Sequence, residues 1–154
     1  MYNINMENIN DLQIGKAGEY LVCADLILKG NIAFPSEQGL HYDVVLSVGN
    51  KLYKVQVKAT RKPIPVPQRK NRTDKYCVNI RRCGKGGRKS YSVEDVDIFA
   101  IVALDTKSIG YIRAKDVRQT MFFLPENGVM ATGKKGIHTL SARKLSTYKI
   151  EDVL

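Results

Sequence analysis

Asp43, Gln56 and Lys58 are spaced so that a β-hairpin would place a carboxylate, an amide and an ammonium group side by side. Gly49-Asn50 lies between two strand-like segments and is typical of a two-residue hairpin turn. Counting back from this turn along both strands sets Asp43 opposite Gln56, and opposed residues share a face of the ribbon. Lys58 follows Gln56 by two residues, so its side chain is predicted to point to that same face.

These side chains have a chemical use at a phosphate group. The oxygens of Asp43 and Gln56 suit a hard divalent cation such as Mg²⁺, which prefers oxygen ligands. Lys58 can orient an attacking water or stabilise negative charge that develops on a phosphate. Glu19 is the best candidate for a further ligand, because Gly18 before it would let a helix approach the sheet closely. A metal, a positioned water and a nearby cation are the parts that phosphodiester hydrolysis needs.

A plainer interpretation of the same spacing stays open. Lys54, Gln56 and Lys58 also fit the solvent-facing positions of an amphipathic strand, with Asp43 as their ion-pair partner. Many basic hairpins would match that pattern without any catalytic role.

The first half of the chain is predicted to supply the helix and the hairpin that position these residues. Apolar residues recur at helical spacing after Asp11, which we expect to cap a helix over residues 12–29. Gly30-Asn31 would end this helix. The two strands of the hairpin are predicted at 42–48 and 51–60.

The second half of the chain contains a nearly continuous apolar run at 97–104, which predicts a buried central strand. Segment 109–114 would pair with it, 76–81 is predicted as a further strand, and 116–121 as a short helix. The tail from Ser141 shows no clear period. Three roles stay open for the part of the chain after about residue 120: capping the sheet, forming a subunit interface or contacting DNA. Together these elements predict an α/β fold with a mixed sheet.

The charge of the chain is concentrated between residues 61 and 90. The chain has 25 Lys and Arg against 15 Asp and Glu, a formal net charge of +10. This segment contains many bases and one acid, Asp74, and accounts for the whole excess. Such a local field suits a polyanion, so we expect nucleic acid in preference to a solvated loop or a membrane surface. The bases expected to contact it are Arg61, Lys62, Arg69, Lys70, Arg72, Lys75, Arg81, Arg82, Lys85, Arg88 and Lys89.

Length and composition predict one globular domain over residues 1–154, with the basic segment as an excursion from it. Apolar residues make up 44% of the chain and charged residues 26%, an ordinary composition for such a domain. The polar segment 1–11 lacks the features of a signal peptide, so we expect a cytoplasmic protein. Cys23, Cys77 and Cys83 include no C-x-x-C pair, which argues against both disulfides and a zinc site.

The chain resembles the PD-(D/E)xK nuclease superfamily in the residues that carry its signature, namely Gly18-Glu19, Asp43 and Gln56-Val57-Lys58. The resemblance covers the segment from the predicted helix to the end of the hairpin, with weaker support from the later strands. It implies a restriction-endonuclease-like αβββαβ core with a central mixed sheet, and Mg²⁺-dependent cleavage of DNA.

Residue by residue, the resemblance implies metal binding by Glu19, Asp43 and Gln56, and a catalytic site made of these three with Lys58. Two positions depart from the commonest signature. Tyr42 stands where the signature has proline, and Gln56 replaces the commoner acid, which removes one negative charge from the metal site. A branch similar to intron-encoded homing endonucleases has this glutamine.

The expected function is therefore a Mg²⁺-dependent endonuclease acting on double-stranded DNA, site-specific in the manner of homing enzymes and of bacterial or phage origin. Cutting both strands with one small domain needs at least two copies, which predicts a homodimer or homotetramer. Two alternatives stay open. One is a structure-selective nuclease such as a Holliday-junction resolvase, and the other is a DNA-binding protein whose metal site has decayed.

Overall fold

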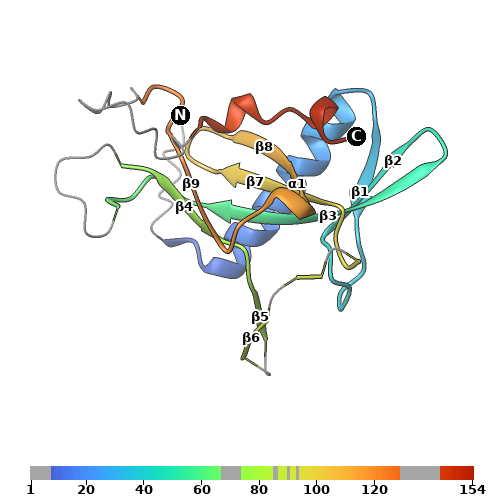
Figure 1. Ribbon diagram of the computed structural model, residues 1–154, viewed down its shortest axis with the longest axis horizontal. Coiled ribbons are helices and arrows are strands. Elements are labelled where there is room, and N and C mark those ends of the chain that lie inside the picture. The colour runs from blue at the N-terminus through green and yellow to red at the C-terminus, as the bar shows by residue number, and fades with distance from the viewer. Residues whose placement is uncertain (1–7, 67–73, 85–86, 90, 93, 129–142) are drawn as a thin grey trace.

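The computed structural model describes residues 8–66, 74–84, 87–89, 91–92, 94–128 and 143–154, with only the backbone at 82–84 and 87–89. Its centre is a five-stranded sheet in the order β1-β2-β3-β7-β8. Helix α1 packs on one face, and the two-stranded sheet of β4 and β9 lies against the other (Figure 1). The elements are α1 (Asp11–Leu28), β1 (Ile32–Pro35), β2 (Val44–Val48), β3 (Lys51–Thr60), β4 (Tyr76–Asn79), β5 (Arg82–Gly84), β6 (Gly87–Lys89), β7 (Ile98–Ala103), β8 (Ser108–Arg113), η2 (Ala114–Asp116), β9 (Thr120–Phe123), η3 (Leu145–Thr147) and η4 (Ile150–Asp152).

Helix α1 is capped by Asn10, so the cap predicted at Asp11 is wrong by one residue. The Asn10 side chain accepts a hydrogen bond from the backbone N–H of Gln13, and the Gln13 side chain accepts one from the backbone N–H of Asn10, both at 2.9 Å. This reciprocal pair satisfies two N–H groups, where a cap at Asp11 would satisfy one. Gly30 follows the helix at φ +84°, consistent with the predicted end. No described helix is both long and apolar enough to cross a membrane.

Strands β2 and β3 form the predicted hairpin. Their pairs run from Val48 opposite Lys51 at the turn to Val44 opposite Val55. Gly49 takes the positive φ of 57° that such a turn favours. The register is therefore the one that counting from the turn predicts. Strand β1 pairs antiparallel with β2 and was not predicted, because its four residues are too few for a pattern to show.

Strand β7 is the buried central strand that the apolar run predicts, since all six of its residues are buried. It lies parallel to β3 and antiparallel to β8, so the sheet is mixed, as expected. A parallel pair needs a long crossover connection. In its described residues this crossover contains β4, β5 and β6, where the expected αβββαβ order has a second helix.

The short helix predicted at residues 116–121 is wrong. A single 3₁₀ turn, η2, leads instead into strand β9, which pairs antiparallel with β4. Phe123 on β9 is fully buried, and Tyr76 on β4 is 1% exposed. Burying these rings against the central sheet requires an extended chain, and this tertiary packing overrides the weak local helix preference.

Apolar side chains form one core on each face of the central sheet. Because successive strand residues point to opposite faces, β3 directs Val55 and Val57 toward α1, and Gln56 and Lys58 toward β4 and β9. The core under α1 contains Val22, Cys23, Leu26, Val44, Leu46, Val55, Val57, Ala100 and Val102. The core under β4 and β9 contains Tyr76, Val78, Ile80, Phe99, Ile101, Ile112, Phe123 and Leu145.

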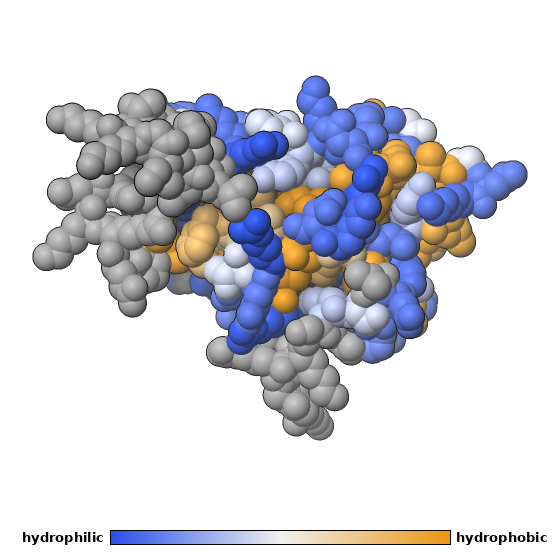
Figure 2. All heavy atoms as spheres, viewed as in Figure 1, coloured by the Kyte–Doolittle hydropathy of each residue, from blue (hydrophilic) through white to orange (hydrophobic). Residues whose placement is uncertain are grey.

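The described part of the C-terminal tail caps the β8 edge of the sheet. The backbone N–H of Tyr111 donates to the carbonyl of Tyr148 at 2.9 Å. Leu145 and Ile150 are buried, one in each core. Of the three roles left open for the tail, these residues therefore perform the first. At the opposite end of the sheet, hydrophobic side chains are exposed over β1 and the β2–β3 hairpin (Figure 2).

Candidate active site

Asp43 lies where the β2–β3 ladder ends. Its backbone N–H donates to the carbonyl of Val55 at 2.9 Å. Beyond this point the strands separate, and the Asp43 carboxylate takes the place of a backbone carbonyl by accepting the N–H of Val57 at 2.9 Å. The same oxygen, Oδ2, accepts a hydrogen bond from the Gln56 side chain. Asp43 and Gln56 thus meet as the hairpin register predicts.

Gln56 presents its amide nitrogen to Asp43, whereas we expected its oxygen to point into a shared metal site. Nε2 contacts Asp43 Oδ2 and lies 3.4 Å from the backbone carbonyl oxygen of Val57. An amide hydrogen is the natural partner of a carboxylate that is withdrawn from solvent; Gln56 is 8% exposed and Asp43 is half-buried. The donor therefore lies between two oxygens, one acidic and one from the main chain. The Val57 carbonyl has no sequence signal and was not predicted.

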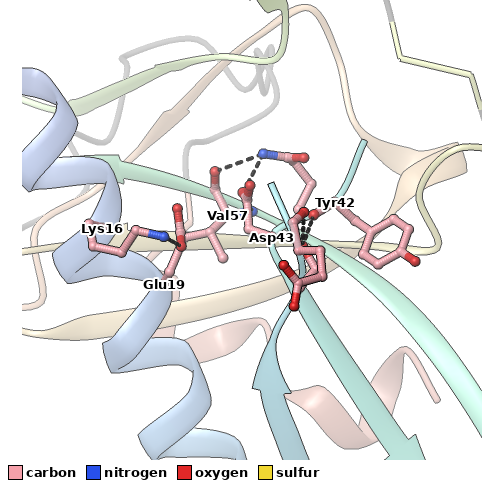
Figure 3. Close-up of polar contacts among 8 residues, drawn as sticks. Lys16, Glu19, Tyr42, Asp43 and Val57 are labelled. Atoms are coloured by element: carbon pink, nitrogen blue, oxygen red, sulfur yellow. Dashed lines mark hydrogen bonds and ion pairs between the residues drawn. The ribbon is translucent and has the colours of Figure 1, made fainter. Parts of the chain in front are cut away.

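Glu19 approaches from the other face of the sheet, on α1. Gly18 beside it packs against β3 so closely that an added Cβ would lie 2.8 Å from the Ala59 Cβ. The close approach predicted for this glycine is therefore present. The Glu19 carboxylate forms an ion pair with Lys16 one helical turn earlier (Figure 3). Lys16 was not among the predicted site residues, although its three-residue spacing from Glu19 is visible in the sequence.

The electrostatics link these residues to one another. Burial is the largest cause that raises the pKa of Asp43 above its usual 3.8, and the negative charge of Glu19 raises it further. The Val57 N–H, Lys58 and Lys16 act in the opposite direction without cancelling the rise. The hydrogen bond to Glu19 raises the pKa of Lys16. Glu19 and Lys58 therefore lie within electrostatic reach of Asp43, and the two acids repel each other.

Lys58 extends from β3 toward the second layer. Its ammonium donates to the hydroxyl of Tyr91 at 3.0 Å and to the backbone carbonyl of Arg81 at 3.1 Å. The Tyr91 ring packs edge-on against Phe99, with ring centroids 5.2 Å apart. Lys58 is thus part of a contact network, which distinguishes it from the solvent-facing lysine of a plain amphipathic strand.

The donor set fits a hard cation with few protein ligands. Among the described residues, no three His, Cys, Asp or Glu side chains gather as a metal cluster. The oxygens available are the carboxylates of Asp43 and Glu19, the Val57 carbonyl and, after rotation of its amide, the Gln56 side chain. Two repelling carboxylates with a neutral oxygen nearby suit Mg²⁺, which keeps several waters when bound.

The predicted DNA-contacting bases are only partly described. Side chains are described for Arg61, Lys62, Lys75 and Arg81, and the backbones of Arg82, Arg88 and Lys89 lie in the β5–β6 hairpin. Arg69, Lys70, Arg72 and Lys85 lie outside the described residues. Arg61 has a structural contact, because its guanidinium donates to the carbonyl of Ile9 and lies 3.4 Å from an Asp11 oxygen. It therefore ties the start of α1 to the end of β3.

Comparisons with known proteins bear on the family and the fold of the chain. The family model of the PD-(D/E)XK endonucleases matches residues 9–139. No curated protein matches the sequence. Among solved structures, the chain is similar to the bacterial homing endonuclease I-Ssp6803I, with 16% identity and a TM-score of 0.63 over 82% of this chain and 86% of that one. At this identity the likeness concerns the fold, and it supports the predicted restriction-endonuclease-like sheet.

Proposed function

We propose that this chain, which belongs to the PD-(D/E)XK endonuclease family, is a Mg²⁺-dependent enzyme that hydrolyses phosphodiester bonds of double-stranded DNA. The observation that carries the proposal is the set of contacts made by Asp43. Its carboxylate bonds to Gln56 and to the Val57 N–H, while the charges of Glu19 and Lys58 act on its pKa. A lone ion pair on an amphipathic strand would not connect these four side chains.

Asp43, Glu19 and Gln56 would hold the cation, with the Val57 carbonyl as a further oxygen. The carboxylates of Asp43 and Glu19 repel each other, and a bound cation would relieve this repulsion. The site therefore has a physical reason to bind positive charge. A bound Mg²⁺ would polarise a phosphoryl oxygen and favour loss of a proton from the attacking water.

The residues of the chain itself perform the remaining tasks. Lys58 would orient the attacking water and stabilise the negative charge that grows on the phosphate. In the step, the water oxygen forms a bond to phosphorus and the bond from phosphorus to the leaving sugar oxygen breaks. The water loses a proton and the leaving oxygen gains one, so the cut leaves one phosphate end and one hydroxyl end.

The basic segment would hold the DNA beside this site. It begins directly after the strand that carries Lys58, and it contains the whole excess positive charge of the chain. Most of its bases would contact phosphates, which positions a duplex without reading its sequence. Site-specific cutting is the favoured form of the activity, because the fold resembles that of a homing endonuclease.

We further propose that the active enzyme is a homodimer or homotetramer. One site per chain can attack one strand, and a double-strand cut requires a second site related by symmetry. Light scattering of the protein alone and with a DNA duplex measures the number of copies directly.

Cleavage by Lys58→Ala, with Lys54→Ala as its matched control, tests the function. Lys54 lies on the same strand and face, but its ammonium contacts the Glu94 carbonyl. With Mg²⁺ and a mixture of plasmid and phage DNA, we expect the wild type and Lys54→Ala to cut, and Lys58→Ala to bind DNA without cutting. Full nicking by Lys58→Ala would exclude this site.

The same assay separates the two alternatives. A four-way junction that competes strongly against linear duplex would indicate a resolvase. Salt-sensitive DNA binding with or without Mg²⁺, and no product in any divalent metal, would indicate a DNA-binding protein with a decayed site.

A further inference from the structure

We propose that Tyr91 is a positioning residue for Lys58, and that through it the β5–β6 hairpin determines where the Lys58 ammonium lies. This inference rests on the proposed role of Lys58 in hydrolysis. It concerns a residue outside the family signature.

The contacts of Lys58 meet the hairpin at both of its ends. Strands β5 and β6 pair antiparallel, with Arg82 opposite Lys89. Arg81 comes directly before β5, and Tyr91 follows shortly after β6. The Lys58 ammonium donates to the Arg81 carbonyl at 3.1 Å and to the Tyr91 hydroxyl at 3.0 Å. Lys58 therefore contacts both segments that connect the β5–β6 hairpin to the rest of the fold.

Tyr91 is held in place independently of Lys58. Its ring meets Phe99 edge-on, at an interplanar angle of 81°, and Phe99 is 1% exposed on central strand β7. In the parallel β3–β7 register, Phe99 pairs with Gln56, and Lys58 pairs with the next residue on the same face, Ile101. The Tyr91 hydroxyl is thus fixed relative to the strand that carries both site residues.

The position and the positive charge of the β5–β6 hairpin suit contact with DNA. It projects from the body of the molecule as a separate arm (Figure 1), and its described strands contain Arg82, Arg88 and Lys89. DNA phosphates bound by these bases would shift the hairpin. Arg81 and Tyr91, which flank it, would move with it and would carry the Lys58 ammonium along. Because small displacements of a reacting group cost large factors in rate, the position of Lys58 then depends on how the arm is seated.

The test compares Tyr91→Phe with Tyr148→Phe. Tyr91→Phe removes the hydroxyl and keeps the ring that packs on Phe99. Tyr148 makes the same kind of edge-on contact with Phe123, at 5.6 Å and 83°, so Tyr148→Phe removes a hydroxyl from a similar setting. We expect Tyr91→Phe to lower kcat about tenfold or more at saturating DNA, while its Kd for DNA stays within about twofold of wild type. Tyr148→Phe should match the wild type in both.

A second measurement needs no catalysis. Trace acetylation of the metal-free, DNA-free protein, followed by mass spectrometry, reports how accessible each lysine amine is. We expect Lys58 to react several-fold faster in Tyr91→Phe than in wild type, with Lys54 as the unchanged internal reference.

The outcomes are distinct. Wild-type kcat and unchanged Lys58 acetylation in Tyr91→Phe would overturn the positioning role and leave the nuclease proposal intact, provided that Lys58→Ala is inactive. A Tyr91→Phe protein that melts well below Tyr148→Phe and loses binding and kcat together would also overturn it, because the hydroxyl would then be structural. Absence of cleavage by the wild type would instead refute the proposed function.

Discussion

Gly18 and Ala59 hold helix α1 against strand β3 at a separation that leaves no room for a methyl group. A Cβ on Gly18 would lie 2.8 Å from the Ala59 Cβ and 3.3 Å from a Val57 methyl group. The next residue after Gly18 is Glu19, and Val57 is the residue whose N–H binds the Asp43 carboxylate. The missing methyl therefore sets how near the two carboxylates lie.

Gly18→Ala should lower the free energy of unfolding by about 1–3 kcal/mol, the usual cost of overpacking a well-filled contact. It should also weaken Mg²⁺ binding, because the helix must move and carry Glu19 away from Asp43. Gly15→Ala is the matched control, since nothing lies within 4 Å of a Cβ added there. That change should stabilise the protein by up to about 1 kcal/mol through helix propensity. Urea denaturation of both variants measures the difference, and equal effects would contradict the close approach.

Asp43→Asn should make the metal-free protein more stable at neutral pH while removing its activity. Burial raises the pKa of Asp43 above 3.8, so between 3.8 and that raised value the folded protein binds more protons than the unfolded chain. The stability of the wild type therefore falls as the pH rises through this window. Asparagine does not ionise, and its amide oxygen can still accept the Val57 N–H.

Thermal melts in EDTA at a series of pH values check this prediction. The advantage of Asp43→Asn should be largest at pH 7 and should shrink as the pH falls toward 3.8. With Mg²⁺ the order should reverse, because only the wild type gains from the metal. A variant that is less stable than wild type at pH 7 in EDTA would show that the Asp43 charge stabilises the fold.

Local patterns in the sequence were sufficient for the parts of the site that one hairpin and one helix supply. Gly49-Asn50 fixed the register, and the register brought Asp43 to Gln56. Gly18 signalled the close approach of the helix. These inferences succeed because turn chemistry and side-chain alternation act over a few residues and leave few alternatives.

The remaining features depend on packing between distant segments. Strand β9 takes its extended form from pairing with β4, and the helix predicted at residues 116–121 failed because local sequence does not show that pairing. The direction of the Gln56 amide follows from its burial beside Asp43 and Val57, which no spacing encodes. The contact between Lys58 and Tyr91 spans 33 residues and joins two layers of the fold.

Gln56→Glu should strengthen Mg²⁺ binding and weaken the metal-free protein. The change replaces a donor to Asp43 by a third carboxylate, which adds its own repulsion to that already present between Asp43 and Glu19. A cation relieves that repulsion, and stabilisation by ligand grows with affinity. The rise in Tm on adding Mg²⁺ should therefore exceed that of wild type. Gln38→Glu, in an exposed loop, is the control and should leave the rise unchanged. A Mg²⁺-induced rise no larger than wild type would place the cation away from Gln56.

Removing the bases of the β5–β6 arm should lower the salt dependence of DNA binding. Each phosphate contact contributes about −0.9 to the slope of log Kobs against log salt for duplex DNA. Changing Arg82, Arg88 and Lys89 together to alanine should therefore reduce the magnitude of the slope by about 2.7. The control changes Lys107, Lys115 and Lys149 to alanine, three lysines outside the basic segment with the same total charge. Fluorescence anisotropy at several salt concentrations gives both slopes. An equal reduction in the two variants would mean that DNA binding depends on the net charge of the protein alone. The β5–β6 hairpin would then make no specific contact with the duplex.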